Sequence, residues 1–213
     1  MPDEIIPIDD PRVLDIKISE CDEPLVNVRD FGIEVIDNHP HVSNDTPARF
    51  SCRRSVAQRL VEANNSLDAA TAIAVAEAHR PLSLQRTFWE INFERVRSAN
   101  PEMSNDAVAD ETAKFVAPPW ITPPHSTGGA VDVVLISAGR EMPMGSGLNE
   151  RCPEMATHAA GISAEERRNR STLLSAMNAA GFVNYGHEWW HFSYGDRYWA
   201  YMTTAESAPF GGI

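Results

Sequence analysis

The sequence predicts an α+β fold in which helices pack on one side of an antiparallel sheet. Residues 131–136 form a β-branched run that is typical of a buried strand, and residues 71–77 alternate in a way that fits a second strand. Other segments carry apolar residues at helical spacing, and two of them begin at a serine that can cap a helix.

Composition limits the classes of protein to consider. The chain has 213 residues, 43% of them hydrophobic, which suits a single domain over residues 1–213. A formal net charge of -12 disfavours binding to nucleic acid or to an anionic membrane. The first residues lack the features of a signal peptide and no apolar run is long enough to span a bilayer, so we expect a cytoplasmic protein. Three widely spaced cysteines are typical of reduced thiols.

Residues 1–50 form an acidic, proline-rich segment that we expect to wrap on the domain. Its alternating pieces, 13–18 and 32–36, are interpreted as strands or edge segments. His39 and His41 are interpreted as loop histidines, with a surface metal site as the alternative.

Apolar spacing predicts a helix over residues 53–63. Residues 71–81 are ambiguous, because alanine favours a helix whereas the alternation favours a strand closed by Pro81. Arg80 precedes that proline, so its backbone is held extended and its side chain can be presented at a strand end. There a guanidinium can bind an oxyanion or a carboxylate, although these residues alone favour a structural ion pair.

Three further helices are predicted towards the C-terminus. Residues 84–99 place Leu84, Phe88, Ile91 and Arg95 on one face, with Gln85, Phe88 and Trp89 as packing residues. Ser104 caps a helix that runs to about residue 116. A capping box at residues 163–166 starts a helix with Leu173, Leu174 and Met177 as its apolar stripe and Gly181 as its stop. The tail, residues 207–213, is expected to be loosely held.

Two short stretches, 125–132 and 188–191, carry the residues of a metal site. Asp132 lies in a buried strand and needs a partner to offset its desolvation, and Gly128 and Gly129 allow the chain to fold His125 back towards it. Zinc in catalytic sites takes three nitrogen and oxygen ligands and leaves the fourth position open. We therefore predict one zinc ion per chain on His125, Asp132 and His191; the alternative is a buried Asp132 paired with an arginine.

Residues 187–191 also spell H-E-x-x-H, a motif that binds zinc when it lies on a helix. Gly186 precedes the motif, and aromatic alternation broken by Gly195 and Asp196 follows it, which predicts two strands joined by a hairpin turn. We therefore expect His187 to be a bystander. A bulge or bend must then bring Glu188 and His191 to one side of the strand.

The H-x6-D block at 125–132, the E-W-W-H-F block at 188–192 and the His-Arg-Pro segment at 79–81 resemble the zinc D-alanyl-D-alanine dipeptidases, the VanX-type branch of the D,D-peptidases. The resemblance covers nearly the whole chain and favours a strand over residues 71–81. It implies a hedgehog/D,D-peptidase-like fold. It also implies hydrolysis of a small dipeptide, most simply D-Ala-D-Ala, in peptidoglycan metabolism.

The resemblance assigns further roles. Glu188 acts as general base and then acid, and Arg80 meets the oxyanion. Trp189 and Trp190 wall the site, and one of them could line the pocket for a D-alanine methyl group. An acid that holds the substrate ammonium in better-known dipeptidases falls at Asn149, and a serine falls at Pro123, so the preference for a free dipeptide is open.

Other functions fit the same residues. A zinc D,D-carboxypeptidase or L,D-type peptidase acting on cell-wall peptides would share the ligands but would need export. A non-catalytic zinc-binding module would keep the ligands but should lack Glu188. A metal-free globular protein would contain no stoichiometric zinc.

Overall fold

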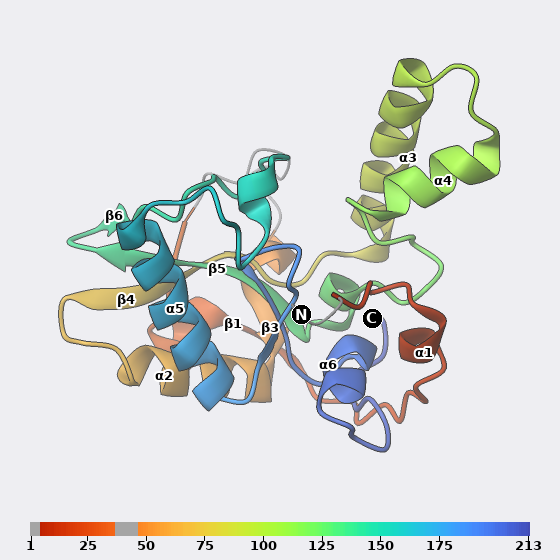
Figure 1. Cartoon of the computed structure of the whole chain (residues 1–213). Coiled ribbons are helices and arrows are strands. Elements are labelled where there is room, and N and C mark those ends of the chain that lie inside the picture. The colour runs from red at the N-terminus through yellow and green to blue at the C-terminus, as the bar shows by residue number, and fades with distance from the viewer. Residues whose placement is uncertain (1–4, 37–46) are drawn as a thin grey trace.

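The computed structural model describes residues 5–36 and 47–213, and Figure 1 shows its elements. The larger sheet contains, in order, β2 (Glu34–Val35), β4 (Thr71–Glu77), β5 (Ala130–Ser137), β8 (His191–Ser193) and β7 (Val183–Asn184), with β6 (Arg140–Glu141) paired to β5. The smaller sheet pairs β1 (Leu25–Asn27) with β3 (Ser51–Arg53). The helices are α1 (Pro11–Leu14), α2 (Arg54–Asn65), α3 (Leu82–Ala99), α4 (Asn105–Ala113), α5 (Ala164–Ala179) and α6 (Arg197–Met202). His39 and His41 lie outside the described residues.

The register of the larger sheet places three polar residues side by side. Asp132 on β5 lies opposite Glu77 on β4 and opposite His191 on β8. A register shift between Val75 and Glu77 precedes this row. These two pairings are antiparallel, and among the described strands of this sheet only β2 and β4 run parallel. The sheet therefore gathers residues that are far apart in the sequence.

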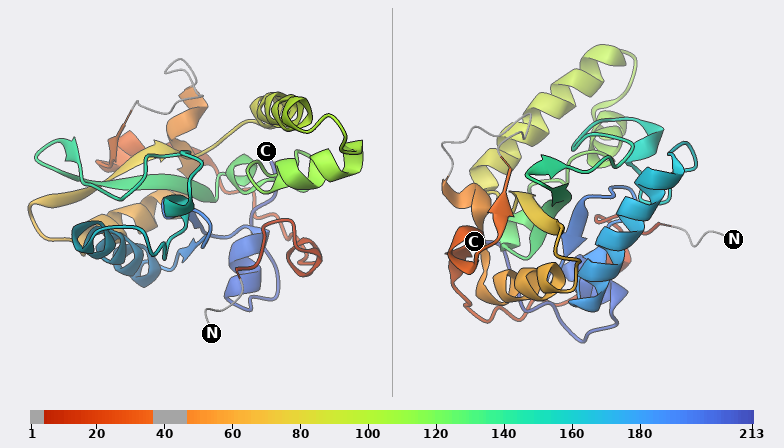
Figure 2. Two further views of the ribbon diagram at one scale, coloured as in Figure 1. Left: turned by 45° about the horizontal axis from the view of Figure 1, so that its top comes forward. Right: turned by 90° about the vertical axis from the view of Figure 1, so that its left-hand side faces the viewer.

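Helices α2 and α5 pack on the same face of the larger sheet, as both views in Figure 2 show. Their apolar residues, including Leu60, Leu173 and Met177, form one core with the strand residues Ile73 and Leu135. The predicted α+β architecture with helices on one side of a largely antiparallel sheet is confirmed. Helices α3 and α4 pack against each other and project from this body.

Two of the predicted helix starts are confirmed by hydrogen bonds at their caps. The Ser104 hydroxyl accepts from the N–H of Ala107 at the start of α4. At the start of α5, Ser163 and Glu166 form the reciprocal bonds of a capping box. The ambiguous segment 71–77 is the strand β4. All three cysteines are free thiols, and no described helix is long and apolar enough to cross a membrane.

Parts of two segments predicted as strands are helical. In the segment 13–18, residues 13 and 14 belong to the short helix α1, because the Asp10 carboxylate caps its first turn and Pro11 suits the first helical position. Ile18 at the end of that segment forms an isolated bridge with Ala208. The hairpin predicted around Gly195 is also wrong. Asp196 accepts a hydrogen bond from the N–H of Trp199 and so starts α6, where the aromatic alternation had favoured a strand.

One prediction of burial is wrong as well. The tail is not loosely held, because Ala208 and Phe210 are buried and Ala208 bridges to Ile18. On α3, Gln85 and Trp89 are buried together with Val96, as expected of packing residues. Ile91 on the same helix is 62% exposed.

Candidate metal centre

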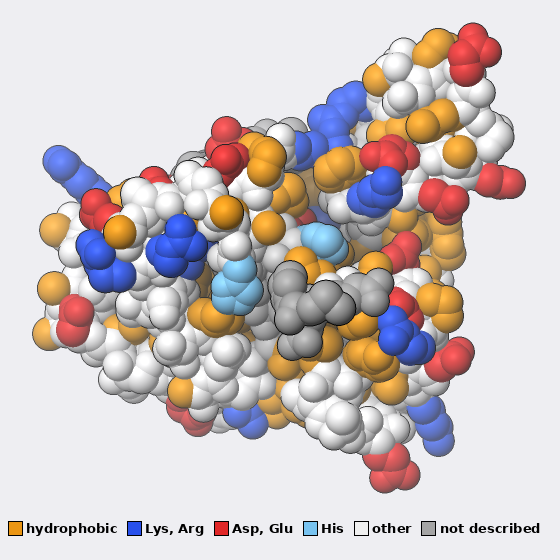
Figure 3. Space-filling view, viewed as in Figure 1, with side chains coloured by type: hydrophobic (Ala, Val, Ile, Leu, Met, Phe, Trp, Pro, Cys, Tyr) orange, Lys and Arg blue, Asp and Glu red, His pale blue; other side chains and the backbone are white. Residues whose placement is uncertain are grey.

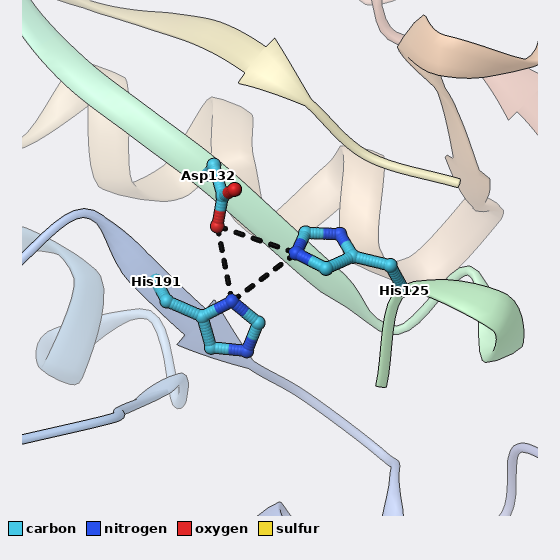
Figure 4. Close-up of side chains that lie close together, drawn as sticks. All are labelled: His125, Asp132 and His191. Carbon is cyan, nitrogen blue, oxygen red and sulfur yellow. Dashed lines mark hydrogen bonds and ion pairs between the residues drawn. The ribbon is translucent and has the colours of Figure 1, made fainter. Parts of the chain in front are cut away.

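Three different elements deliver the predicted ligands to one point (Figure 4). Asp132 lies on β5, His191 begins β8, and His125 lies on the short 3-10 helix Pro124–Thr127. A turn with Gly128 in the left-handed region, at φ 70°, joins that helix to β5. A Cβ atom on Gly129 would collide with the carbonyl oxygen of Tyr194. Both glycines are therefore needed to bring His125 next to Asp132.

The donor atoms of these three residues converge. The Asp132 Oδ1 atom lies 3.3 Å from His125 Nε2 and 3.0 Å from His191 Nδ1, and the two ring nitrogens are 3.2 Å apart. All three side chains are buried. The two histidines lower the pKa of Asp132 well below its ordinary value, although burial alone would raise it.

The hydrogen bond of His125 leaves one of its ring nitrogens facing the other two donor atoms. Its Nδ1 lies 2.7 Å from the carbonyl oxygen of Ala78. Since a carbonyl only accepts, Nδ1 carries a proton, and Nε2 is the ring nitrogen that faces Asp132 and can bind a metal ion. The backbone carbonyl is the usual partner that orients a metal-binding imidazole. Two imidazoles and one carboxylate are a donor set suited to zinc.

Glu188 lies beside the cluster on a turn between β7 and β8. The N–H of Glu188 donates to Tyr185 and the N–H of His191 donates to Glu188, so this stretch bends as predicted and is not a helix. The Glu188 Oε2 atom lies 4.0 Å from His191 Nδ1. Burial raises the pKa of Glu188 to about 7, which suits a group that exchanges protons near neutral pH.

Arg80 faces the cluster and forms the structural ion pair that its residues alone had favoured, with Glu77 as the partner. Its guanidinium donates to both oxygens of Glu77, at 2.8 and 2.5 Å, and to Gln85 Oε1 at 2.9 Å. Gln85 was expected only to pack, but it also donates to the carbonyl of Ala117. A signal for Glu77 was present, since it is an acid at the end of a buried strand and three residues before an arginine.

A cavity of about 560 Å³ opens next to these residues. Arg80, Asn149 and Trp190 line it together with Glu188 and the three predicted ligands. Trp189 was expected to wall the site but does not line this cavity, because its indole turns away and donates to Ser146. His187 also lies outside it, with its ring edge-on to Tyr185, as expected of a bystander.

The model of the D-ala-D-ala dipeptidase family matches residues 40–207. A D-alanyl-D-alanine dipeptidase of Synechocystis is 29% identical over an alignment of 219 positions that covers 89% of each chain. One from Enterococcus faecium is 44% identical over 71 residues, covering 32% of this chain and 35% of the relative.

Two solved structures are similar at low sequence identity. VanYB in complex with D-alanine-D-alanine is 16% identical with a TM-score of 0.46, covering 72% of this chain and 78% of the other. The LD-carboxypeptidase LdcB is 19% identical with a TM-score of 0.47, covering 86% and 74%.

Proposed function

The chain belongs to the D-Ala-D-Ala dipeptidase family, and on this premise we propose that it is a zinc-dependent hydrolase of small D,D-dipeptides, with D-Ala-D-Ala as the reference substrate. One observation carries the proposal. The donor atoms of His125, Asp132 and His191 all lie within 4.8 Å of one another, in the wall of a cavity that also contains an acid and an arginine.

In this proposal His125, Asp132 and His191 hold the zinc ion. Zinc in such a site lowers the pKa of water and polarises a carbonyl group. The Ala78 carbonyl fixes the His125 ring, so its Nε2 is oriented before the ion arrives. The burial of the three side chains excludes competing water from their donor atoms.

Glu188 is the proposed proton carrier. Its carboxylate takes a proton from the water that attacks the scissile carbonyl carbon, and passes it to the amine nitrogen as the C–N bond breaks. A pKa of about 7 suits both directions of transfer, because neither form of the group is strongly favoured near neutral pH.

Arg80 is proposed to hold the oxygen of the scissile carbonyl as its negative charge grows. The bonds to Glu77 and Gln85 use three of its N–H groups and leave two for the substrate. Because the guanidinium is already fixed, it need not reorganise during the reaction, and one such donor commonly contributes about 3 to 4 kcal/mol. We assign Asn149 and Trp190 to substrate contact in the same cavity.

The test combines metal content with turnover. We expect elemental analysis to find one zinc per chain, and the purified protein to release D-alanine from D-Ala-D-Ala. Glu188→Ala should retain the zinc and lose the turnover. A protein without zinc would contradict the metal site, and a Glu188→Ala variant with full turnover would contradict the role of Glu188.

A further inference from the structure

The cavity is larger than the reference substrate needs. Its volume is about 560 Å³. Even if each of the roughly eleven non-hydrogen atoms of Ala-Ala took the ~30 Å³ that one water occupies in the liquid, the dipeptide would fill only about 330 Å³. The remaining space extends towards the α3–α4 hairpin, because residues of both helices and of the segment after α4 line it.

The wall of that additional space is positively charged. Arg95 on α3, Lys114 after α4 and Arg151 in the loop before residue 153 all line the cavity. Outside the metal cluster and Glu188, Asp9 is the one acid among the described lining residues. Figure 3 shows basic side chains where the hairpin meets the rest of the molecule. The chain as a whole has a net charge of -12, whereas this part of the cavity wall is positively charged. The wall therefore favours an anionic ligand.

Arg151 is the best placed of the three cations. Its Nη2 donates to Asn92 Oδ1 on α3 at 2.5 Å, and its guanidinium carbon lies 4.1 Å from the centre of the Phe115 ring. These contacts fix the guanidinium plane, and no other described residue accepts from its remaining N–H groups. A guanidinium that is held in one orientation and has free N–H groups suits a carboxylate, which can accept two parallel hydrogen bonds from it. Lys114 is partly neutralised by Glu111, and Arg95 is exposed.

The wall also contains apolar side chains that can pack along a substrate. Phe88 and Ile91 on α3 and Phe115 after α4 line the cavity. The sequence placed Phe88 and Ile91 on the apolar face of α3, and the structure turns this face into the cavity rather than into the core. An apolar wall with a fixed cation is typical of a specific subsite.

We propose that this site selects a peptide that carries a carboxylate remote from the scissile bond, and that Arg151 binds that carboxylate. The inference rests on the proposed function and narrows its substrate class. The carboxylate can come from two sources, an acidic side chain on the C-terminal residue or an acidic group joined to the N-terminal residue.

The test uses pairs of peptides whose members have nearly the same size but differ in charge. D-Ala-D-Glu is compared with D-Ala-D-Gln, and N-succinyl-D-Ala-D-Ala with its neutral succinamoyl counterpart. In at least one pair we expect kcat/KM to be about ten- to a hundredfold higher for the anionic member, mainly through KM. The pair that shows this preference identifies the source of the carboxylate.

Variants then test the residue. In Arg151→Gln the ratio of kcat/KM for the anionic peptide to kcat/KM for the neutral peptide should fall to near one. Arg151→Lys keeps a positive charge and should restore part of this ratio. The control is Arg97→Gln, which changes an arginine of α3 that pairs with Glu94 outside the cavity and should keep the wild-type ratio. A ratio of one in both pairs for the wild type, or a ratio unchanged in Arg151→Gln, would overturn the inference.

Binding distinguishes this inference from the proposed function. The same pairs are titrated calorimetrically into zinc-loaded Glu188→Ala, which needs no turnover. Suppose that the wild-type protein cleaves none of these peptides, and that the anionic member of a pair still binds at least tenfold more tightly than the neutral member. In that case the proposed function fails and the subsite stands. Equal binding of both members in each pair would overturn the subsite, whatever the turnover.

Discussion

At the scale of single residues, Arg80 depends on a partner that is buried more deeply than itself. Glu77 is 1% exposed and accepts two hydrogen bonds from the guanidinium. The sheet register also places Glu77 opposite Asp132, so one row of the sheet holds both the predicted ligand and the residue that positions Arg80. The chemistry of the site therefore extends beyond the residues that face the substrate.

Glu77→Gln should lower kcat about ten- to a hundredfold while zinc stays bound. The amide keeps the size of the side chain but loses the charge and one of the two acceptors, so Arg80 is no longer fixed for the developing oxyanion. The control is Glu94→Gln, because Glu94 forms an exposed pair with Arg97 at the same three-residue spacing. Steady-state kinetics with metal analysis measures the effect; equal kcat for Glu77→Gln and wild type would contradict the role of Glu77.

Metal removal should lower the melting temperature. An ion that binds only the folded state at a free concentration a thousand times its dissociation constant contributes about 4 kcal/mol, which is roughly 8–16 °C for a domain of this size. Thermal unfolding with and without a chelator measures this shift. In Asp132→Asn the shift should largely vanish, whereas Asp106→Asn, on the exposed first turn of α4, should keep it. A full shift in Asp132→Asn would rule out this carboxylate as a ligand.

At the scale of elements, α5 covers the core beneath the ligand-bearing strands and begins at a capping box. Ser163→Ala should destabilise the protein by about 1 kcal/mol, because the N–H of Glu166 loses its acceptor. Urea unfolding measures the change. Ser171→Ala, at an exposed position within the same helix, should leave stability unchanged or slightly higher. Equal losses in both variants would show that the cap itself contributes nothing.

The elements that the sequence predicted correctly are those with local causes. Examples are the capping serines, the β-branched run of β5 and the glycine after α5. Each acts on structure within a few residues, so its effect can be predicted from the local sequence. The aromatic alternation after Gly195 wrongly predicted a strand where the structure has α6. The alternation suits a strand, but the capping bond of Asp196 starts a helix there. The cluster of His125, Asp132 and His191 was predictable because an acid inside a buried strand needs a partner, and the two histidines lie in stretches that can fold back towards it.

Other features could not be predicted, because they depend on register or on cavity shape. Glu77 has a sequence signal in its spacing from Arg80, but its place opposite Asp132 depends on a register shift just before it in the pairing of β4 and β5. Spacing marks one face of α3 as apolar, but it does not show whether that face covers a core or lines a cavity. Arg151 carries no local signal, since its place beside Phe115 and Asn92 comes from the packing of a loop against the hairpin.

At the scale of the whole molecule, Glu20 joins the two ends of the described chain behind the metal site. Its Oε2 atom accepts from the N–H of Gly211 at 2.6 Å and from Arg53 at 2.9 Å. Arg53 is buried and donates in turn to the carbonyl oxygen of Thr127, two residues after His125. The N-terminal segment, the tail and the ligand loop are therefore tied through one ion pair.

The contribution of Glu20 to stability should depend on pH. Burial alone would raise the pKa of Glu20, but the bonds from Gly211, Asp22 and Arg53 lower it below its ordinary value of 4.5. A carboxyl group whose pKa is lower in the folded state stabilises that state above the unfolded pKa, and the stabilisation is lost as the pH falls through the folded pKa. We therefore expect Glu20→Gln to cost about 1 kcal/mol at neutral pH and progressively less below about pH 4.5.

Urea unfolding of wild type and Glu20→Gln at several pH values measures this difference. Both proteins are kept in chelator, so that loss of metal in acid does not contribute. Glu62→Gln, an exposed substitution on α2, should show no such dependence. A second readout at neutral pH is zinc affinity, which should be weaker in Glu20→Gln because Arg53 then holds the loop of His125 less firmly. A stability difference that stays constant down to about pH 3.5 would show that the carboxylate charge is not what joins the two ends.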